Sequence, residues 1–154
     1  MKRYLFLFIV ALFTLCSCND GTKLSEAARK YGKEHMKGNP EKIEHVGVGI
    51  VKSIWFADEL KEYAKGLEEN KDKNPEAFQA EIDKANELAK KYRDEKAGTE
   101  WEFQLYYKDE RGYQTNENVW MIVDNDENIL YISMSRDDLP TFPALKMLKD
   151  MGEL

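Results

Sequence analysis

The positions of the cysteines constrain the fold of this chain more than any other feature. The chain has 154 residues, and both of its cysteines, Cys16 and Cys18, lie within the first 18. No disulfide can cross-link the remaining residues, so the body must be stabilised by packing alone. With 42% hydrophobic residues and four prolines, the chain is too apolar for a disordered tail. Its length fits one domain better than two.

The N-terminus has the pattern of a targeting signal. Lys2 and Arg3 give it a positive start, and residues 5–15 are apolar except for Thr14. A membrane-spanning helix needs about 20 apolar residues, so this run is too short to span and has the length of a signal-peptide core. The positive flank and the polar break at Asn19 also argue against a buried N-terminal helix.

The end of the apolar run, Leu15-Cys16-Ser17-Cys18, resembles a lipobox, the site at which bacterial lipoproteins are lipidated and cleaved. Cys16 departs from the small or β-branched residues usual at its position. The resemblance implies that residues 1–17 are a cleaved signal peptide, residues 18–22 are a lipidated cysteine and tether, and residues 23–154 form one domain. Lipidation at Cys16 would put bulky Leu15 at the cleavage position, and an ordinary secretory signal would leave Cys18 without a role.

Lipidation at Cys18 would give the chain a diacylglycerol and an amide-linked acyl chain such as palmitate. Two lipid signals anchor a protein stably, whereas one acyl chain binds a membrane only marginally. The resemblance therefore implies a protein of the bacterial cell envelope. We expect the lipid to anchor the chain to the outer membrane rather than the inner one, with the body in the periplasm or at the cell surface.

The hydrophobic pattern of the body predicts an α+β fold. We expect a helix over 23–36, a strand over 43–56, a helical hairpin, three further strands and a short amphipathic C-terminal segment. Asp58 and Asn74 are expected to start the two hairpin helices, and the second helix is expected to end at Glu95. The last three strands are expected near residues 100–108, 119–123 and 129–134. Together the four strands predict a small antiparallel sheet with helices on one of its faces.

The segments NPEKIEHVGVGIVKSIW and VWMIVDNDENILYI, together with the element order, resemble small cystatin-like or nuclear-transport-factor-like lipoproteins of Bacteroidetes. This resemblance covers most of the body. It implies a helix-and-sheet domain and brings no catalytic residues with it.

The residues give no catalytic or metal motif. His35 and His45 are not paired with a nucleophile motif, and their spacing crosses an expected helix end and strand start, which does not suit zinc. Asp124, Asp126 and Asn128 resemble half of a calcium loop, but the glycine and the twelfth-position carboxylate of an EF-hand are missing. We therefore expect a hairpin turn there, no metal site, no cofactor and no enzyme activity.

Aromatic residues with polar neighbours mark a candidate binding surface. Tyr106 shares its strand face with Gln104, and Trp120 shares its face with Asn118, so alternation places both among polar residues. We predict that Tyr106 and Trp120 form this surface. The alternative is that residues 140–148 pack over them.

These observations favour a lipid-anchored, non-catalytic domain that binds a protein or a small molecule through the sheet face opposite its helices. The chain has 29 acidic and 23 basic residues, which argues against a nucleic-acid partner. Two alternatives remain open. One is an immunity protein or protease inhibitor, and the other is a small enzyme with a carboxylate-only site in a cone-shaped cavity.

Overall fold

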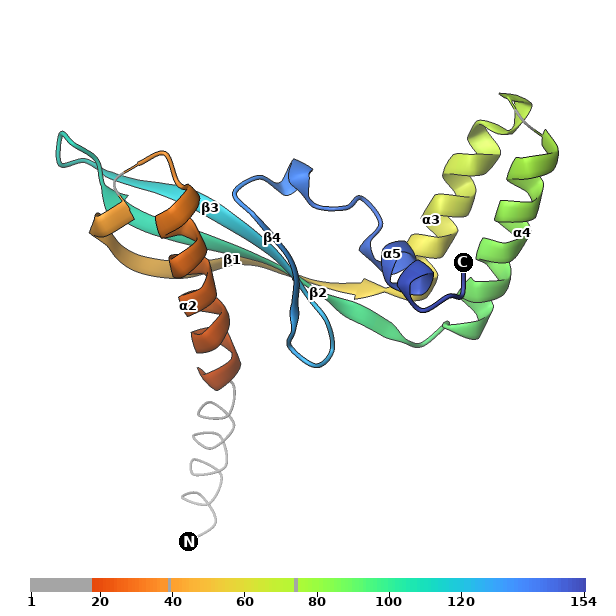
Figure 1. The fold of residues 1–154 in the computed structure, drawn as a ribbon, viewed down its shortest axis with the longest axis horizontal. Coiled ribbons are helices and arrows are strands. Elements are labelled where there is room, and N and C mark those ends of the chain that lie inside the picture. The colour runs from red at the N-terminus through yellow and green to blue at the C-terminus, as the bar shows by residue number, and fades with distance from the viewer. Residues whose placement is uncertain (1–17, 39, 74) are drawn as a thin grey trace, which may run out of the picture. The chain divides into compact units, whose positions relative to one another are not determined.

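The structure is a computed structural model that describes residues 18–38, 40–73 and 75–154, with side chains from residue 23 onward except at 39–40 and 73–74. Residues 1–17, which include the expected signal peptide and Cys16, lie outside the described part. Within these described ranges, four α-helices and four strands follow one another in the expected order (Figure 1). They are α2 (Cys18–His35), β1 (Ile43–Trp55), α3 (Phe56–Glu69), α4 (Pro75–Lys91), β2 (Lys96–Lys108), β3 (Gln114–Val123), β4 (Ile129–Ser133) and α5 (Pro143–Asp150).

The four strands form one antiparallel sheet in the order β1-β2-β3-β4. The predicted α+β class is therefore confirmed. β3 and β4 form a hairpin in which Trp120 lies opposite Ser133 and Ile122 lies opposite Tyr131. Among the described residues, no helix combines the length and the apolar character needed to cross a membrane.

The chain divides into two compact units, which we describe separately. Unit 1 contains the residues up to Val48 together with Phe103–Val119, and unit 2 contains Gly49–Glu102 and Trp120–Leu154. The strands β1, β2 and β3 each contribute residues to both units.

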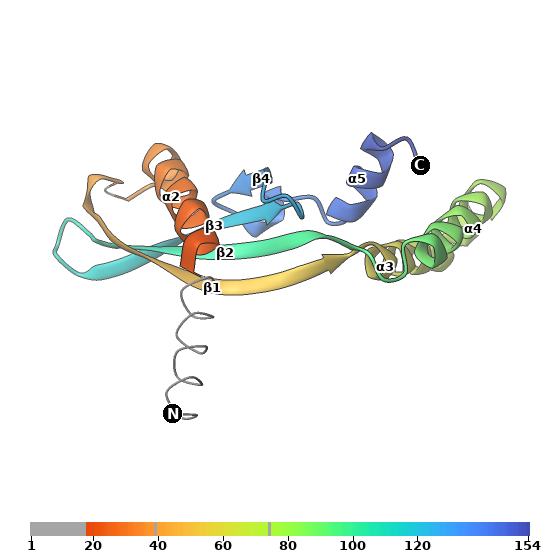
Figure 2. The same cartoon turned by 90° about the horizontal axis from the view of Figure 1, so that it is seen from below.

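The core of unit 1 forms where α2 packs on the C-terminal half of β2 (Figure 2). Gly32 of α2 faces the side chain of Leu105 so closely that a Cβ atom would overlap it. The Arg29 guanidinium donates to the carbonyl oxygen of Ile43 at 2.7 Å and so ties α2 to β1. The buried apolar residues of this unit are Leu24, Ala28, Ile43, Phe103, Leu105, Tyr107 and Val119.

The core of unit 2 forms around the hairpin of α3 and α4, which lie side by side in Figures 1 and 2. Both helices turn a stripe of apolar residues inward, and β3 and α5 complete the cluster. Its largest fully buried members are Leu60, Leu88, Ile122 and Leu148.

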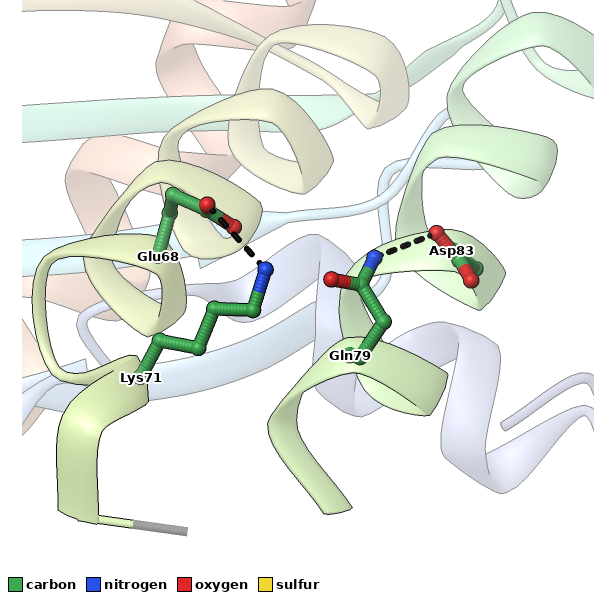
Figure 3. Close-up of polar contacts among 4 residues, drawn as sticks. All are labelled: Glu68, Lys71, Gln79 and Asp83. Atoms are coloured by element: carbon green, nitrogen blue, oxygen red, sulfur yellow. Dashed lines mark hydrogen bonds and ion pairs between the residues drawn. The ribbon is translucent and has the colours of Figure 1, made fainter. Parts of the chain in front are cut away.

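The outer face of the hairpin is polar, as the Lys/Glu-rich sequence indicates. At its tip, Lys71 Nζ lies 3.4 Å from Glu68 Oε1, and Gln79 Nε2 donates to Asp83 Oδ1 at 2.8 Å (Figure 3). Contacts of this kind, three or four residues apart, stabilise a helix by a few tenths of a kcal/mol, about 0.2–0.5. This face is a solvated helix surface.

In the described residues, α2 includes residues 19–22, and the expected tether at residues 18–22 stays a prediction. Two local expectations are corrected. α3 begins directly after β1, with Trp55 at the N-cap and no side-chain cap, so Asp58 lies inside the first turn. α4 ends at Lys91, four residues before the expected end at Glu95, because the chain must turn before β2 begins at Lys96.

Candidate functional site on the edge strand

The structure places the two predicted surface aromatics in different units. Tyr106 belongs to unit 1, where it is half-buried, and its ring stacks on His45 with the centroids 5.8 Å apart. A Cβ atom at Gly47 would lie 3.2 Å from Tyr106 Cε2, so the ring covers this glycine.

Trp120 belongs to unit 2, where it is half-buried and packs against the hydrophobic cluster that contains Leu148 and Ala144. The alternative in which residues 140–148 pack over both Tyr106 and Trp120 stays a prediction. Tyr106 and Trp120 are thus each held by contacts within their own unit.

His35 and His45, which were also singled out in the sequence, have local partners, whereas only the backbone of Cys18 is described. Cys18 is the first residue of α2, and its side chain lies outside the described part. His35 stands in the last turn of α2, where its ring stacks on Tyr31 at 4.0 Å and its Nδ1 lies 2.9 Å from the Tyr31 carbonyl oxygen. His45 stacks on Tyr106, and so neither histidine is joined to a candidate nucleophile by these contacts.

The loop after β3 is organised by Asp124. Its Oδ1 accepts hydrogen bonds at 2.8 Å from the backbone nitrogens of Asp126 and Asn128, while Glu127 takes a left-handed conformation with φ of 62°. Burial raises the pKa of Asp124, but the hydrogen bonds from Asn128 and Asp126 outweigh it and hold the pKa below its ordinary value. The carboxylate therefore serves as the internal anchor of a turn. In the described part of the chain, no three metal-ligating side chains gather into a group that could hold an ion.

Unit 2 contains one carboxyl group with a strongly shifted pKa, which the sequence analysis did not single out. Glu59 on α3 accepts a hydrogen bond at 2.7 Å from the backbone nitrogen of Ala144, in the first turn of α5. Burial raises the pKa of Glu59 to about 7, against the lowering effect of this hydrogen bond and of Lys52. Its position could have been anticipated, because a residue three after Phe56 and one before Leu60 falls beside the apolar stripe of the helix.

The buried carboxylate of Glu100 is compensated by Arg136. The two side chains form an ion pair, and Arg136 Nη2 donates to Glu100 Oε2 at 3.1 Å. This pair explains why Glu100 is buried although alternation places it on a polar face. Glu100 and Glu59 therefore each connect two elements of unit 2, Glu100 through Arg136 and Glu59 through the Ala144 nitrogen.

The cavities described in unit 2 do not contain Glu59. One of about 550 Å³ lies between the hairpin and α5, with Tyr63 and Leu145 in its walls, and Lys84 and Lys149 at its edges. Another of about 610 Å³ is lined by the Asp124 loop and α5. A cavity of about 410 Å³ in unit 1 is lined by polar residues around Lys108. The shifted carboxyl group and these cavities are therefore separate features.

The largest departure from the expected burial lies on β1. Alternation predicts that one face of this strand is covered, yet of its 13 residues only Ile43 and Ile54, near the two ends, are buried. Val48 and Ile50 on one face and Val51 on the other are each about half exposed, at 48%, 53% and 51%. We name Val48–Ser53, all exposed, the open segment of β1.

β1 is also an edge strand, because β2 is its single neighbour in the described sheet. The outer side of an edge strand presents unpaired backbone donors and acceptors, to which another strand can bind. Proteins usually protect such edges with charges, prolines or bulges. Between Val46 and Trp55, β1 carries one charge, Lys52, and no proline. In the described part of the chain, the open segment of β1 therefore combines the outer backbone groups of a sheet edge with exposed apolar side chains.

Comparison with protein families, with curated proteins and with solved structures finds no match for this chain. The resemblance to small envelope lipoproteins therefore remains an expectation from the sequence. The geometry of β1 carries the functional argument.

Proposed function

We propose that this chain is a lipid-anchored binding protein of the bacterial cell envelope that takes up an extended partner segment on the edge of β1. Cys18 would carry the lipid, and β1 would add the partner as a further strand of its sheet. The observation that carries the proposal is the open segment of β1, which is apolar and exposed on both faces at a sheet edge.

Strand addition uses both features of this edge. Main-chain hydrogen bonds provide affinity, and alternating side chains provide specificity. On β1, Val48 and Ile50 would contact a partner's side chains on one face of the sheet, and Val51 would do so on the other. Tyr106 lies beside this edge through its contacts with His45 and Gly47, so it can border the bound segment in unit 1.

A non-catalytic role is favoured over the carboxylate enzyme. Glu59 has the pKa of a proton-transfer group, but its carboxylate is hydrogen-bonded to α5 and lines none of the three cavities above. A general acid or base must reach its substrate, so a carboxyl group engaged inside the fold is poorly placed for that role.

The lipid anchor is tested at Cys18. Cys18→Ala should abolish labelling of the protein by a radioactive fatty acid and its partitioning into a detergent phase. Cys16→Ser is the matched control and should still label. Labelling of the Cys18→Ala variant through Cys16 would refute the assignment.

The binding surface is tested in cells with a photo-crosslinking amino acid at single positions of the full chain. Ile50 on β1 and Ile129 on β4 are a matched pair, because both are exposed isoleucines on the two edge strands of the sheet. We expect a discrete covalent adduct from position 50 and little from position 129. Equal adduct formation at both positions, or none at position 50, would overturn the proposal.

A further inference from the structure

The sequence of β1 is symmetric in chemical type about Val48 at the first, second and fourth positions to either side, but not at the third, where His45 and Val51 differ. Val48 is flanked by Gly47 and Gly49. The next residues outward are Val46 and Ile50, which are both β-branched. Four residues to either side are charges of opposite sign, Glu44 and Lys52. A strand with this pattern complements a second copy of itself running in the opposite direction.

We propose that β1 pairs antiparallel with β1 of a second copy of the chain, with the two-fold axis passing through Val48. The inference rests on the proposed function, because it names the partner of the same edge. In this register Val48 faces Val48, Val46 faces Ile50, and Glu44 faces Lys52 of the other copy. Each contact apart from the central one occurs twice, as an isologous interface requires.

Charge selects this register over its neighbours. Centring the pair on Gly49 would place Lys52 opposite Val46, and centring it on Gly47 would place Glu44 opposite Ile50. Both alternatives leave charges opposite apolar residues. Opposite charges placed directly across a strand pair stabilise it, so pairing centred on Val48 matches charge with charge and apolar with apolar on the strand face that carries Val48, while His45 lies opposite Val51 on the other face.

The charged side chains are accessible for this contact. The side chain of Glu44 is 46% exposed and lies 3.3 Å from Lys108 Nζ on β2. A second copy would put its Lys52 on the other side of Glu44, so that the carboxylate lies between two lysines. If Cys18 is lipidated, attachment to one membrane also raises the effective concentration of the copies toward one another.

The register is tested by disulfide formation in the full chain in its oxidising envelope. In the proposed pair, the two residues at position 48 are directly opposite, with Cα atoms about 4.5–5.5 Å apart, within the range of a disulfide. Val48→Cys should form disulfide-linked dimers. Val51→Cys is the matched control, since Val51 is equally exposed on the same strand but would lie about 20 Å from its symmetry mate.

We expect at least about tenfold more dimer from Val48→Cys than from Val51→Cys on non-reducing gels, with the unsubstituted chain as the baseline for Cys16 and Cys18. Equal yields from the two variants, or no dimer above the baseline, would overturn the inference. Adding Lys52→Glu to Val48→Cys should lower the dimer yield, because like charges would then face each other, and adding Glu44→Lys as well should restore it. Thermal melting of each variant identifies any loss caused by unfolding.

The photo-crosslinking experiment separates this inference from the proposed function. An adduct at position 50 with twice the mass of the chain supports both. An adduct of another mass leaves the proposed function standing and overturns the second-copy inference. The absence of an adduct at position 50 contradicts both.

Discussion

β1 and β2 are neighbouring strands of equal length, 13 residues each, with opposite burial. β2 buries Phe103 and Leu105 completely, whereas β1 exposes Val48, Ile50 and Val51. The apolar content of the two strands does not explain this difference, because β1 is as rich in Val and Ile as many buried strands. In the described sheet, β2 has a strand neighbour on each side, whereas β1 has only one. This difference between the two strands is the basis of our proposal that a partner strand binds β1.

The largest expected difference in stability is between a variant that truncates a buried side chain of β2 and one that truncates an exposed side chain of β1. Phe103 is fully buried, so Phe103→Ala should lower the free energy of unfolding by about 3–5 kcal/mol. Ile50→Ala on β1 should change it by no more than about 0.5 kcal/mol. Chemical denaturation of both variants measures the difference. Equal losses would mean that β1 is also buried.

Truncating a half-buried residue should cause an intermediate loss in the free energy of unfolding. Trp120 packs against the unit 2 cluster with part of its surface exposed, so Trp120→Ala should lower the free energy of unfolding by about 2 kcal/mol. A loss within about 0.5 kcal/mol would show that Trp120 is a surface residue and would restore it as a candidate binding residue. The readout is again chemical denaturation.

A glycine of β2 tests how tightly this strand is enclosed, and a glycine of α3 serves as the comparison. A Cβ atom at Gly98 of β2 would overlap the carbonyl oxygen of Val123 on β3, and backbone cannot easily move aside. Gly98→Ala should therefore lower the free energy of unfolding by about 1–2 kcal/mol. Gly66 on α3 has no neighbour within 4 Å of such an atom, so Gly66→Ala should stabilise the protein by about 0.5–1 kcal/mol. A stabilising Gly98→Ala would contradict the close contact between β2 and β3.

The smallest effect concerns Glu59 and depends on pH. Its pKa is raised to about 7 from the model-compound value of 4.5, so between these pH values the folded chain binds more protons than the unfolded one. Stability must then fall as pH rises from about 4.5 to about 7. Because the side chain is partly exposed, we expect a loss of about 1 kcal/mol over this window.

Glu59→Gln should remove this pH dependence while keeping an acceptor for the Ala144 nitrogen. Unfolding measured at pH 5 and pH 8 in both proteins checks this. An unchanged difference between the two pH values in the variant would assign the effect to other groups.

The periodicity of the sequence predicted the fold class and the element order, because local hydrophobic patterns specify helices and strands. The helical stripe through Leu60 and Leu88 and the alternation of Phe103 and Leu105 are both found. The burial of β1 could not be predicted in the same way. Its Val and Ile residues show where a strand forms, but exposure depends on strand order, which arises from contacts distant in sequence.

The candidate site was predicted less well than the fold. Alternation placed Tyr106 and Trp120 among polar neighbours, but Trp120 packs against the hydrophobic cluster of unit 2, whose members come together only on folding. Glu59 was missed because charge alone does not distinguish it from other glutamates. Its hydrogen bond to Ala144 joins residues far apart in the sequence.

The central claim is that β1 pairs with β1 of a second copy through its outer edge, and amide hydrogen exchange tests it most directly. Exchange would be followed in the purified full-length protein in detergent at low and high protein concentration. We predict that the outward-pointing amides of the open segment of β1 exchange quickly when dilute and become protected at high concentration, while the amides of β2 stay protected throughout. If these outward-pointing amides already exchange slowly in the dilute protein, or if their exchange does not change with concentration, pairing between two copies through this edge is contradicted.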